Sequence, residues 1–224
     1  MILVAAPSGP VPAMPAAPPV SDFQKMWWSA YYQQLNQQQM MQMWNSWCML
    51  DRDRNGHIFA AELAGMTVPA GPTMWAGRPI GYQAAARLIQ LFDEKKTRTI
   101  MFHEFAALHQ FLTKMQVAFS TADVMRSGMI GCHEVYTALK AGDIEAELPA
   151  IQAYFQKFAL LGWYGQTLDF MGFMMMCCDI TLAKNLFKKH QKDHDKDGKV
   201  DLTEMLCIAA DLTAMSSMAG TGVY

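Results

Sequence analysis

Oxygen-bearing side chains recur at a regular spacing in residues 51–62, DRDRNGHIFAAE. The pattern supplies side-chain oxygens at loop positions 1, 3 and 5, a backbone carbonyl at position 7, and at position 12 a carboxylate that can bind through both oxygens. The residues at these positions are Asp51, Asp53, Asn55, His57 and Glu62. Calcium is a hard cation that takes about six to eight oxygen ligands. The spacing therefore predicts a calcium-binding loop.

A second stretch, residues 193–204 (DHDKDGKVDLTE), repeats the same pattern. Its predicted ligands are Asp193, Asp195, Asp197, Lys199 through its backbone carbonyl, and Glu204. Both stretches match the loop of the EF-hand, a helix–loop–helix unit in which a glycine at position 6 lets the chain turn with positive φ. Asp201 adds a carboxylate at position 9, so we expect the second loop to bind calcium more tightly at equal geometry.

EF-hands bury their apolar faces in pairs, so two copies separated by most of the chain indicate further copies between them. The loop has an apolar frame, with a β-bridge residue at position 8 and apolar residues at positions 13 and 16. This frame recurs in three further windows, which start at Asp93, Asp123 and Leu161. The position-8 residues of the five windows are Ile58, Ile100, Ile130, Leu168 and Val200.

The window at residues 123–134 is a weaker calcium candidate than the two complete loops. It retains four candidate ligands, which are Asp123, Ser127, Met129 through its carbonyl, and Glu134. Met125, however, occupies position 3, where a thioether is too soft a ligand for calcium. Weak binding and no binding both stay open for this loop.

The other two windows lack calcium chemistry. In residues 93–104, Lys95 replaces an acid and Arg98 replaces the turn glycine, and two positive charges inside a loop oppose the binding of a cation. Residues 161–172 have no acid at positions 1, 3, 5 or 12. We therefore expect both windows to be structural.

The intervals between windows alternate between long and short. The short ones, residues 105–122 and 173–192, predict one continuous helix each, about 27–30 Å long. The long ones contain helix breakers such as Pro72 and Pro149 and predict two separate helices each. Upstream, the residues rich in aromatic side chains and methionine at 23–50 predict one helix that leads directly into the first loop.

This alternation over five hands resembles the penta-EF-hand family, over about residues 40–224. An aspartate at the first position of the first hand, Asp51, is similar to the branch that contains the apoptosis-linked adaptor and peflin. The resemblance implies an all-α fold of five helix–loop–helix repeats with short β-bridges between paired loops. It implies that hands one and two, and hands three and four, pair within the chain. The fifth hand would pair with a second chain through the strand at Val200, giving a homodimer or heterodimer.

Composition and charge exclude several classes of protein. The 224 residues are 52% hydrophobic and 17% charged with a net charge of −2, so the chain has no basic excess for binding nucleic acid. Residues 1–22, rich in proline and alanine, predict a disordered arm before one penta-EF-hand domain at residues 23–224. Five cysteines without C-x-x-C spacing indicate reduced thiols and a cytoplasmic protein. No uninterrupted apolar run approaches the roughly 18 residues of a membrane helix.

The 20 methionines are the unusual part of the composition. Methionine suits a groove that opens when a sensor EF-hand binds calcium, because its unbranched side chain adapts to many partner shapes. We expect most of them to fill the core. Met40, Met174 and Met175 lie off the inward frame and are the candidates for an exposed surface.

These features predict a non-catalytic calcium sensor or adaptor that recruits proteins, peptides or membranes when it binds Ca²⁺, and that moves from the cytoplasm to membranes with calcium. The alternative is a constitutive non-catalytic subunit of a calpain-like protease complex. A thiol enzyme built on Cys48 and His109 is the weakest interpretation, because Cys48 lies on a helix face shared with tryptophans and is expected in the core.

Overall fold

The computed structural model describes residues 13–15, 25–93, 95–162, 165–190 and 205. The chain divides into two compact units. Most of the expected N-terminal arm and the whole of the fifth loop, residues 193–204, lie outside the described residues, so the predictions made for them stay predictions.

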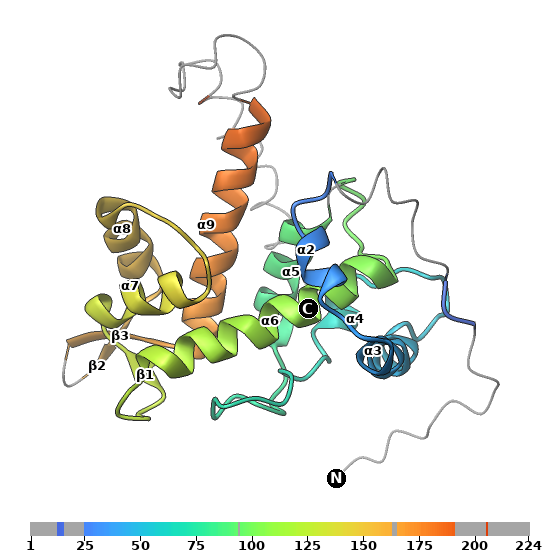
Figure 1. Cartoon of the computed structure of the whole chain (residues 1–224), viewed down its shortest axis with the longest axis horizontal. Coiled ribbons are helices and arrows are strands. Elements are labelled where there is room, and N and C mark those ends of the chain that lie inside the picture. Colours follow the sequence, from blue (N-terminus) through green and yellow to red (C-terminus); the bar gives the residue numbers. More distant parts are fainter. Residues whose placement is uncertain (1–12, 16–24, 94, 163–164, 191–204, 206–224) are drawn as a thin grey trace. The chain divides into compact units, whose positions relative to one another are not determined.

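The first unit comprises Met1–Gly71 and Trp75–Lys114 and contains hands one and two. Its helices are α2 (Ser29–Gln33), α3 (Gln37–Leu50), α4 (Ala60–Leu63), α5 (Gly81–Phe92) and the first part of α6 (Phe102–Ala122) (Figure 1). As predicted from the breakers, the long interval between hands one and two contains two separate helices, although α4 is only one turn long.

The prediction of one helix over residues 23–50 is wrong, because α2 and α3 are separate. Helix α2 ends at Gln33, and Asn36 caps the start of α3: its side chain accepts a hydrogen bond from the Gln39 N–H at 2.9 Å, and the Gln39 side chain accepts one from the Asn36 N–H at 3.0 Å. This reciprocal capping box satisfies two amides that would otherwise lack a partner at a helix start. The residues before α3 pack on α5 and α6, where the ring of Trp27 lies 5.0 Å from that of Phe92.

The second unit comprises Pro72–Met74 and Met115–Tyr224 and contains hands three and four. Its described elements after α6 are β1 (Met129–Ile130), α7 (Cys132–Ala141), α8 (Leu148–Phe158), β2 (Leu160–Gly162), β3 (Gly165–Asp169) and α9 (Phe170–His190). The three strands form one antiparallel sheet in the order β1-β3-β2, and α8 packs against both α7 and α9 (Figure 1).

The repeat frame positions the hands as expected. In hands one to four, the helix after the loop begins at loop position 10, at Ala60, Phe102, Cys132 and Phe170. Hands one and two are joined by an antiparallel bridge in which Ile58 and Ile100 exchange N–H···O bonds of 3.0 and 2.9 Å. In hands three and four, Ile130 pairs with Leu168. The all-α fold with β-bridges between paired loops is confirmed.

The same frame forms the core of each unit. The buried side chains at positions 13 and 16 of the first four windows are Leu63, Met66, Phe105, Leu108, Val135, Ala138, Phe173 and Met176. In the fifth window, Met205 at position 13 is described and is 54% exposed, in contrast to its counterparts. The frame therefore holds for the two pairs of hands that the structure describes.

Each short interval is spanned by one helix of 21 residues, α6 and, in the described part of the second interval, α9. Among the described residues, one helix is long and apolar enough to cross a membrane, at Phe170–Lys189 with a mean hydropathy of 1.3. Because 67% of that window is buried inside the structure, α9 has the pattern of a core helix rather than a lipid-facing one.

Candidate metal centre

The first loop brings three carboxylates together at the junction of α3 and α4. Asp51 follows the last residue of α3, and Glu62 lies within α4. Ligand oxygens of Asp51, Asp53 and Glu62 all lie within 4.8 Å of one another, and this is the one such group of three acidic, histidine or cysteine side chains in the described part of the chain. An all-oxygen set of this charge fits calcium rather than a softer metal.

The loop backbone holds Asp51 in place. Its two carboxylate oxygens accept hydrogen bonds from the N–H groups of Asn55 at 3.1 Å and Gly56 at 3.0 Å. Gly56 has a φ of +80°, which glycine adopts without strain and which turns both amides toward the aspartate. The Asn55 side chain in turn donates to Asp53 at 2.8 Å and accepts from the His57 N–H at 2.7 Å.

Glu62 is oriented from two directions. Its Oε1 accepts a hydrogen bond from the Arg52 N–H at 3.2 Å, and its Oε2 accepts one from the Phe59 N–H at 3.5 Å. Asp51 and Glu62 are each only 7% exposed, whereas Asp53 is exposed. A metal at this centre would therefore be held between two buried carboxylates and reached from the side of Asp53.

The weaker candidate loop, residues 123–134, makes the hydrogen bonds that hold a calcium loop in shape, but its set of calcium ligands is incomplete. Asp123 accepts hydrogen bonds from the Ser127 N–H at 2.9 Å and the Gly128 N–H at 2.7 Å. The Ser127 hydroxyl donates to the Met129 carbonyl at 2.9 Å, and Glu134 accepts from the Gly131 N–H. Met125, at position 3, is 88% exposed. The structure thus places two acids, Asp123 and Glu134, on the loop frame without a third acid between them.

A feature of this third loop was missed by the sequence reasoning. Met74, from the linker before α5, lies against Gly128, where a Cβ atom would stand only 2.7 Å from the methionine sulfur. Gly128 has a φ of +77°, so the turn requires glycine, whereas the flexible end of the Met74 side chain could move away from an added Cβ atom. The linker is also tied to α6, because the Thr73 hydroxyl donates to the Gln116 side chain at 2.9 Å. No sequence pattern pairs a linker methionine with a loop glycine.

The second and fourth windows agree with a structural role. Arg98 occupies the turn position with a φ of +65°, and Lys95 takes the place of an acid. In the fourth window, strands β2 and β3 take the place of a calcium loop as far as Asp169 at position 9. Helix α9 begins at the next residue, and the Asp169 side chain accepts a hydrogen bond from the Gly172 N–H at 2.7 Å. The ligands predicted in the fifth loop lie outside the described residues.

The predicted exposure of methionines is partly wrong. Met174 is fully buried, with its sulfur 3.6 Å from the Cys178 Sγ, because the first half of α9 is surrounded on nearly all sides. Met40 and Met175 are half-buried. The more exposed methionines of the first unit are Met41 at 49% and Met49 at 65% on α3, and Met49 lies two residues before Asp51.

The thiol-enzyme interpretation has little chemical support. Burial, together with the charge of Asp51, raises the pKa of Cys48, which keeps the sulfur protonated and weakly nucleophilic. Burial lowers the pKa of His109 to about 4. A histidine so far below its ordinary range is neutral at pH 7 but a poor proton acceptor.

The chain matches no protein-family model. It is 34% identical over 171 residues to Penta-EF hand domain-containing protein 2 of Dictyostelium discoideum, a match that covers 76% of this chain and 78% of that protein. It is 24% identical over 154 residues to peflin of Danio rerio, covering 69% of this chain and 54% of peflin. Among solved structures, a homolog of programmed cell death 6 protein from Leishmania major Friedlin superposes with a TM-score of 0.52 at 23% identity. That match covers 82% of this chain and 93% of the other, and it concerns the fold alone.

Proposed function

Because the chain belongs to the penta-EF-hand family, we propose that it is a calcium sensor or adaptor that binds Ca²⁺ in its first and fifth hands. The observation that carries the proposal is the convergence of Asp51, Asp53 and Glu62 within 4.8 Å on a loop whose sequence matches the calcium pattern. The Asn55 side chain and the His57 carbonyl complete the proposed first site. The fifth site rests on its sequence, with ligands Asp193, Asp195, Asp197, Lys199 and Glu204.

The arrangement supports a coupling between the site and the helices. When bound, calcium supplies two positive charges that offset the mutual repulsion of the carboxylates. Asp51 is fixed at the end of α3, whereas Glu62 belongs to the single-turn helix α4. A shift of the Glu62 carboxylate toward Asp51 therefore moves α4 relative to α3. We propose that this movement changes the exposure of the apolar surface that includes Met41 and Met49.

We further propose a dimer through the fifth hand. The first four hands pair with each other within the chain through the Ile58–Ile100 and Ile130–Leu168 bridges, so a fifth hand has no hand left to pair with in its own chain. The strand at Val200 would form the bridge to a second copy or to a related chain. The partners we propose are proteins or peptides that bind in a calcium-dependent manner. The four described cysteines are not joined in disulfide bonds, which supports a cytoplasmic setting.

The test is a calcium titration by calorimetry on material of measured molar mass. The proposal predicts two sites per chain in a dimer, an increase in hydrophobic-dye fluorescence with calcium, and one site per chain in the Glu62→Gln variant. An unchanged dye signal with both sites filled would contradict the sensor role. Three sites would add the loop at residues 123–134, and a monomer at high concentration would contradict the fifth-hand dimer.

A further inference from the structure

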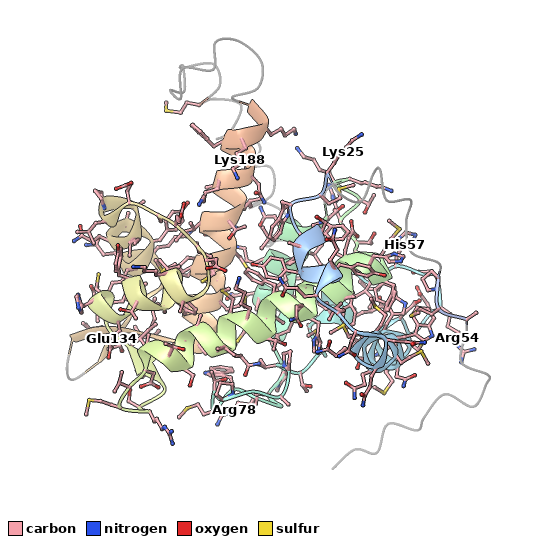
Figure 2. The ribbon with its side chains drawn as sticks, viewed as in Figure 1. Lys25, Arg54, His57, Arg78, Glu134 and Lys188 are labelled. Carbon is pink, nitrogen blue, oxygen red and sulfur yellow. The ribbon has the colours of Figure 1, made fainter. Side chains whose placement is uncertain are left out.

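A short aromatic segment precedes the five repeats and packs on the first hand pair. The aromatic segment comprises residues 25–34, with α2 at its centre, and Lys25 at its start is labelled in Figure 2. Its aromatic side chains are Trp27, Trp28, Tyr31 and Tyr32. Trp28 is only 3% exposed, and the other three are half-buried. The segment is therefore held on the first unit mainly by aromatic rings.

The surface that receives these rings is formed by the C-terminal end of α5 and the middle of α6. The centroid of the Trp27 ring lies 5.0 Å from that of Phe92 and 6.4 Å from that of Phe111. The Tyr31 ring lies 5.7 Å from the same Phe111 ring. Phe92 and Phe111 are fully buried with the segment in place, so its withdrawal would remove the contacts that cover one side of each ring.

Polar contacts give this surface a preference for particular residue types. The Trp27 Nε1 donates a hydrogen bond to the Leu91 carbonyl oxygen at 3.3 Å. Leu91 lies one residue before the end of α5, where carbonyl groups lack the partner that a helix interior provides. Tryptophan can donate to such a carbonyl, whereas phenylalanine has no donor. Near α6, the Lys114 Nζ lies 5.5 Å from the centre of the Tyr31 ring and adds a cation–π contact.

The aromatic segment can leave this surface without disrupting the hand pair. Helix α2 has five residues, none of them buried, and its N-terminus has no side-chain cap. A helix of this length is not stable without the surface on which it packs. The connection at residues 34–36 is largely exposed, and α3 starts with its own capping box at Asn36. Local opening of the segment therefore leaves α3, α5 and α6 in place.

We propose that the aromatic segment is an internal ligand that closes a binding site on α5 and α6. The partner that displaces it is a protein segment with a tryptophan and a second aromatic residue four positions later. Trp27 and Tyr31 have this spacing, and their rings lie 6.1 Å apart and both contact Phe111. The existence of a partner rests on the function proposed above, whereas the closed site itself does not require calcium.

The probe is a synthetic peptide of residues 25–36 with a fluorescent label, and its binding to the full chain is measured by fluorescence anisotropy. The test variant, Trp27→Ala with Tyr31→Ala, opens the site. The matched control, Trp75→Ala with Tyr82→Ala, removes the same two residue types from the first unit, and Tyr82 lies at the opposite end of α5 from Leu91. A second peptide with alanine in place of both rings measures binding that does not depend on them.

We expect the peptide to bind the test variant more tightly than the unchanged chain. A ligand on a short tether competes at an effective concentration on the order of 1 mM, so a peptide with a Kd of about 10 µM for the open site should bind the test variant about 100-fold more tightly. The control variant should bind like the unchanged chain, and the alanine peptide should bind to neither variant. Equal binding to the test variant and the unchanged chain, or an equal gain in the control variant, would overturn the proposal.

Circular dichroism shows whether the test variant keeps its helices. If it does not, Tyr31→Ala alone takes its place, because this change removes one half-buried ring and leaves the Trp27 contacts. The loss of one pair of aromatic contacts should then give a gain in peptide affinity of up to about ten-fold. No gain in a folded Tyr31→Ala variant would also overturn the proposal.

Three outcomes separate the internal ligand from the proposed function and from another occupant. If calorimetry finds no calcium bound while the peptide binds the test variant, the calcium function fails and the internal ligand stands. If calcium is bound while the peptide does not bind the test variant, the internal ligand fails and the calcium function stands. A fall in molar mass from dimer to monomer in the test variant would mean that the segment binds a second copy of the chain, which would overturn its role as an internal ligand.

Discussion

Replacing Glu62 by glutamine should remove the calcium response of the first unit while leaving its calcium-free stability nearly unchanged. Glu62 supplies the carboxylate at position 12 that can bind calcium through both oxygens. The amide of glutamine is close to it in shape, but it carries no charge and has one acceptor oxygen instead of two. The substitution therefore tests the electrostatic role of this side chain with little change in volume.

The calcium-free effect is a balance of two terms. Glu62 lies within 4.8 Å of both Asp51 and Asp53, and two unit charges at that separation repel by about 1 kcal/mol in water and about 3.5 kcal/mol at an effective dielectric constant of 20. Removing the charge of Glu62 removes part of this repulsion and so stabilises the calcium-free folded state. Weakening the hydrogen bonds from the Arg52 and Phe59 amides costs about 1.5–3 kcal/mol at most, and the glutamine carbonyl retains part of it. We expect a net change within about 1 kcal/mol of zero.

In the presence of calcium, the stability that the Glu62→Gln variant loses is not offset by an opposing gain. A site filled at 100 times its Kd stabilises the folded state by about 2.7 kcal/mol, and the variant should lose this gain in the first unit. Urea unfolding followed by tryptophan fluorescence is the assay, because five of the six tryptophans lie in the first unit. The matched control is Glu104→Gln, at the same loop position, where Glu104 accepts a hydrogen bond from the Met101 N–H at 2.8 Å on a loop without a calcium set.

Three results would refute this reasoning. Retention of the calcium gain in Glu62→Gln means that the gain does not come from the first loop. An equal loss in Glu104→Gln means that the glutamate acts through the loop structure and not as a ligand. A calcium-free loss above about 3 kcal/mol means that the hydrogen bonds outweigh the repulsion between the carboxylates.

Three further outcomes are expected. Asn36→Ala, which removes one half of the capping box, should lower the free energy of unfolding by about 1 kcal/mol in urea titrations. Alkylation of Cys48 by iodoacetamide at fixed pH should become faster when calcium is added. Burial and the charge of Asp51 raise the pKa of Cys48, and bound calcium would offset the charge of Asp51. Cys132 is the internal reference, and an unchanged ratio of the Cys48 and Cys132 rates contradicts the prediction. Stability should fall as the pH drops from about 6.5 to 4, by up to about 3 kcal/mol, because the unfolded chain protonates His109 over this range and the folded chain, with a His109 pKa of about 4, does not. His109→Gln should flatten this slope in urea titrations at each pH, and a slope that persists would assign it to another group.

The loop boundaries could be predicted from the sequence because the constraints on them are local. The first three loops begin immediately after Leu50, Phe92 and Ala122, where α3, α5 and α6 end. Each loop needs an apolar bridge residue at position 8 and two apolar residues in the helix that follows, and these positions stay readable even where the calcium ligands are lost. Local spacing therefore predicted the residues of the two bridges, Ile58–Ile100 and Ile130–Leu168, and the eight buried frame residues of the first four hands, and the structure confirms both.

The errors arise where the deciding interaction lies outside that frame. The break between α2 and α3 had a local signal, an asparagine followed three residues later by a glutamine, which the helical character of the glutamine run at residues 37–39 concealed. The burial of Met174 had no local signal, since a helix that is surrounded on nearly all sides leaves no face that a spacing rule could mark as exposed. The hairpin of the fourth window formed where no ligand requirement holds the chain in a calcium loop.

The acids that define the motif are also needed by loops that have no calcium chemistry. In each of the first three loops, the aspartate at position 1 accepts the N–H groups of positions 5 and 6: Asp51 from Asn55 and Gly56, Asp93 from Thr97 and Arg98, Asp123 from Ser127 and Gly128. In each, the glutamate at position 12 accepts the N–H of position 9 and so caps the helix that follows.

An acid at positions 1 and 12 therefore indicates the structure of the loop more directly than it indicates calcium binding. Position 3 makes no such structural contact in the second and third loops, where it is Lys95 or the exposed Met125. In the first loop it is Asp53, and there alone among the described residues does a third carboxylate join the other two. Because the loop does not need the position-3 side chain for folding, the residue type at that position can depend on whether the loop binds calcium. Position 3 therefore distinguishes the calcium loop from the structural loops.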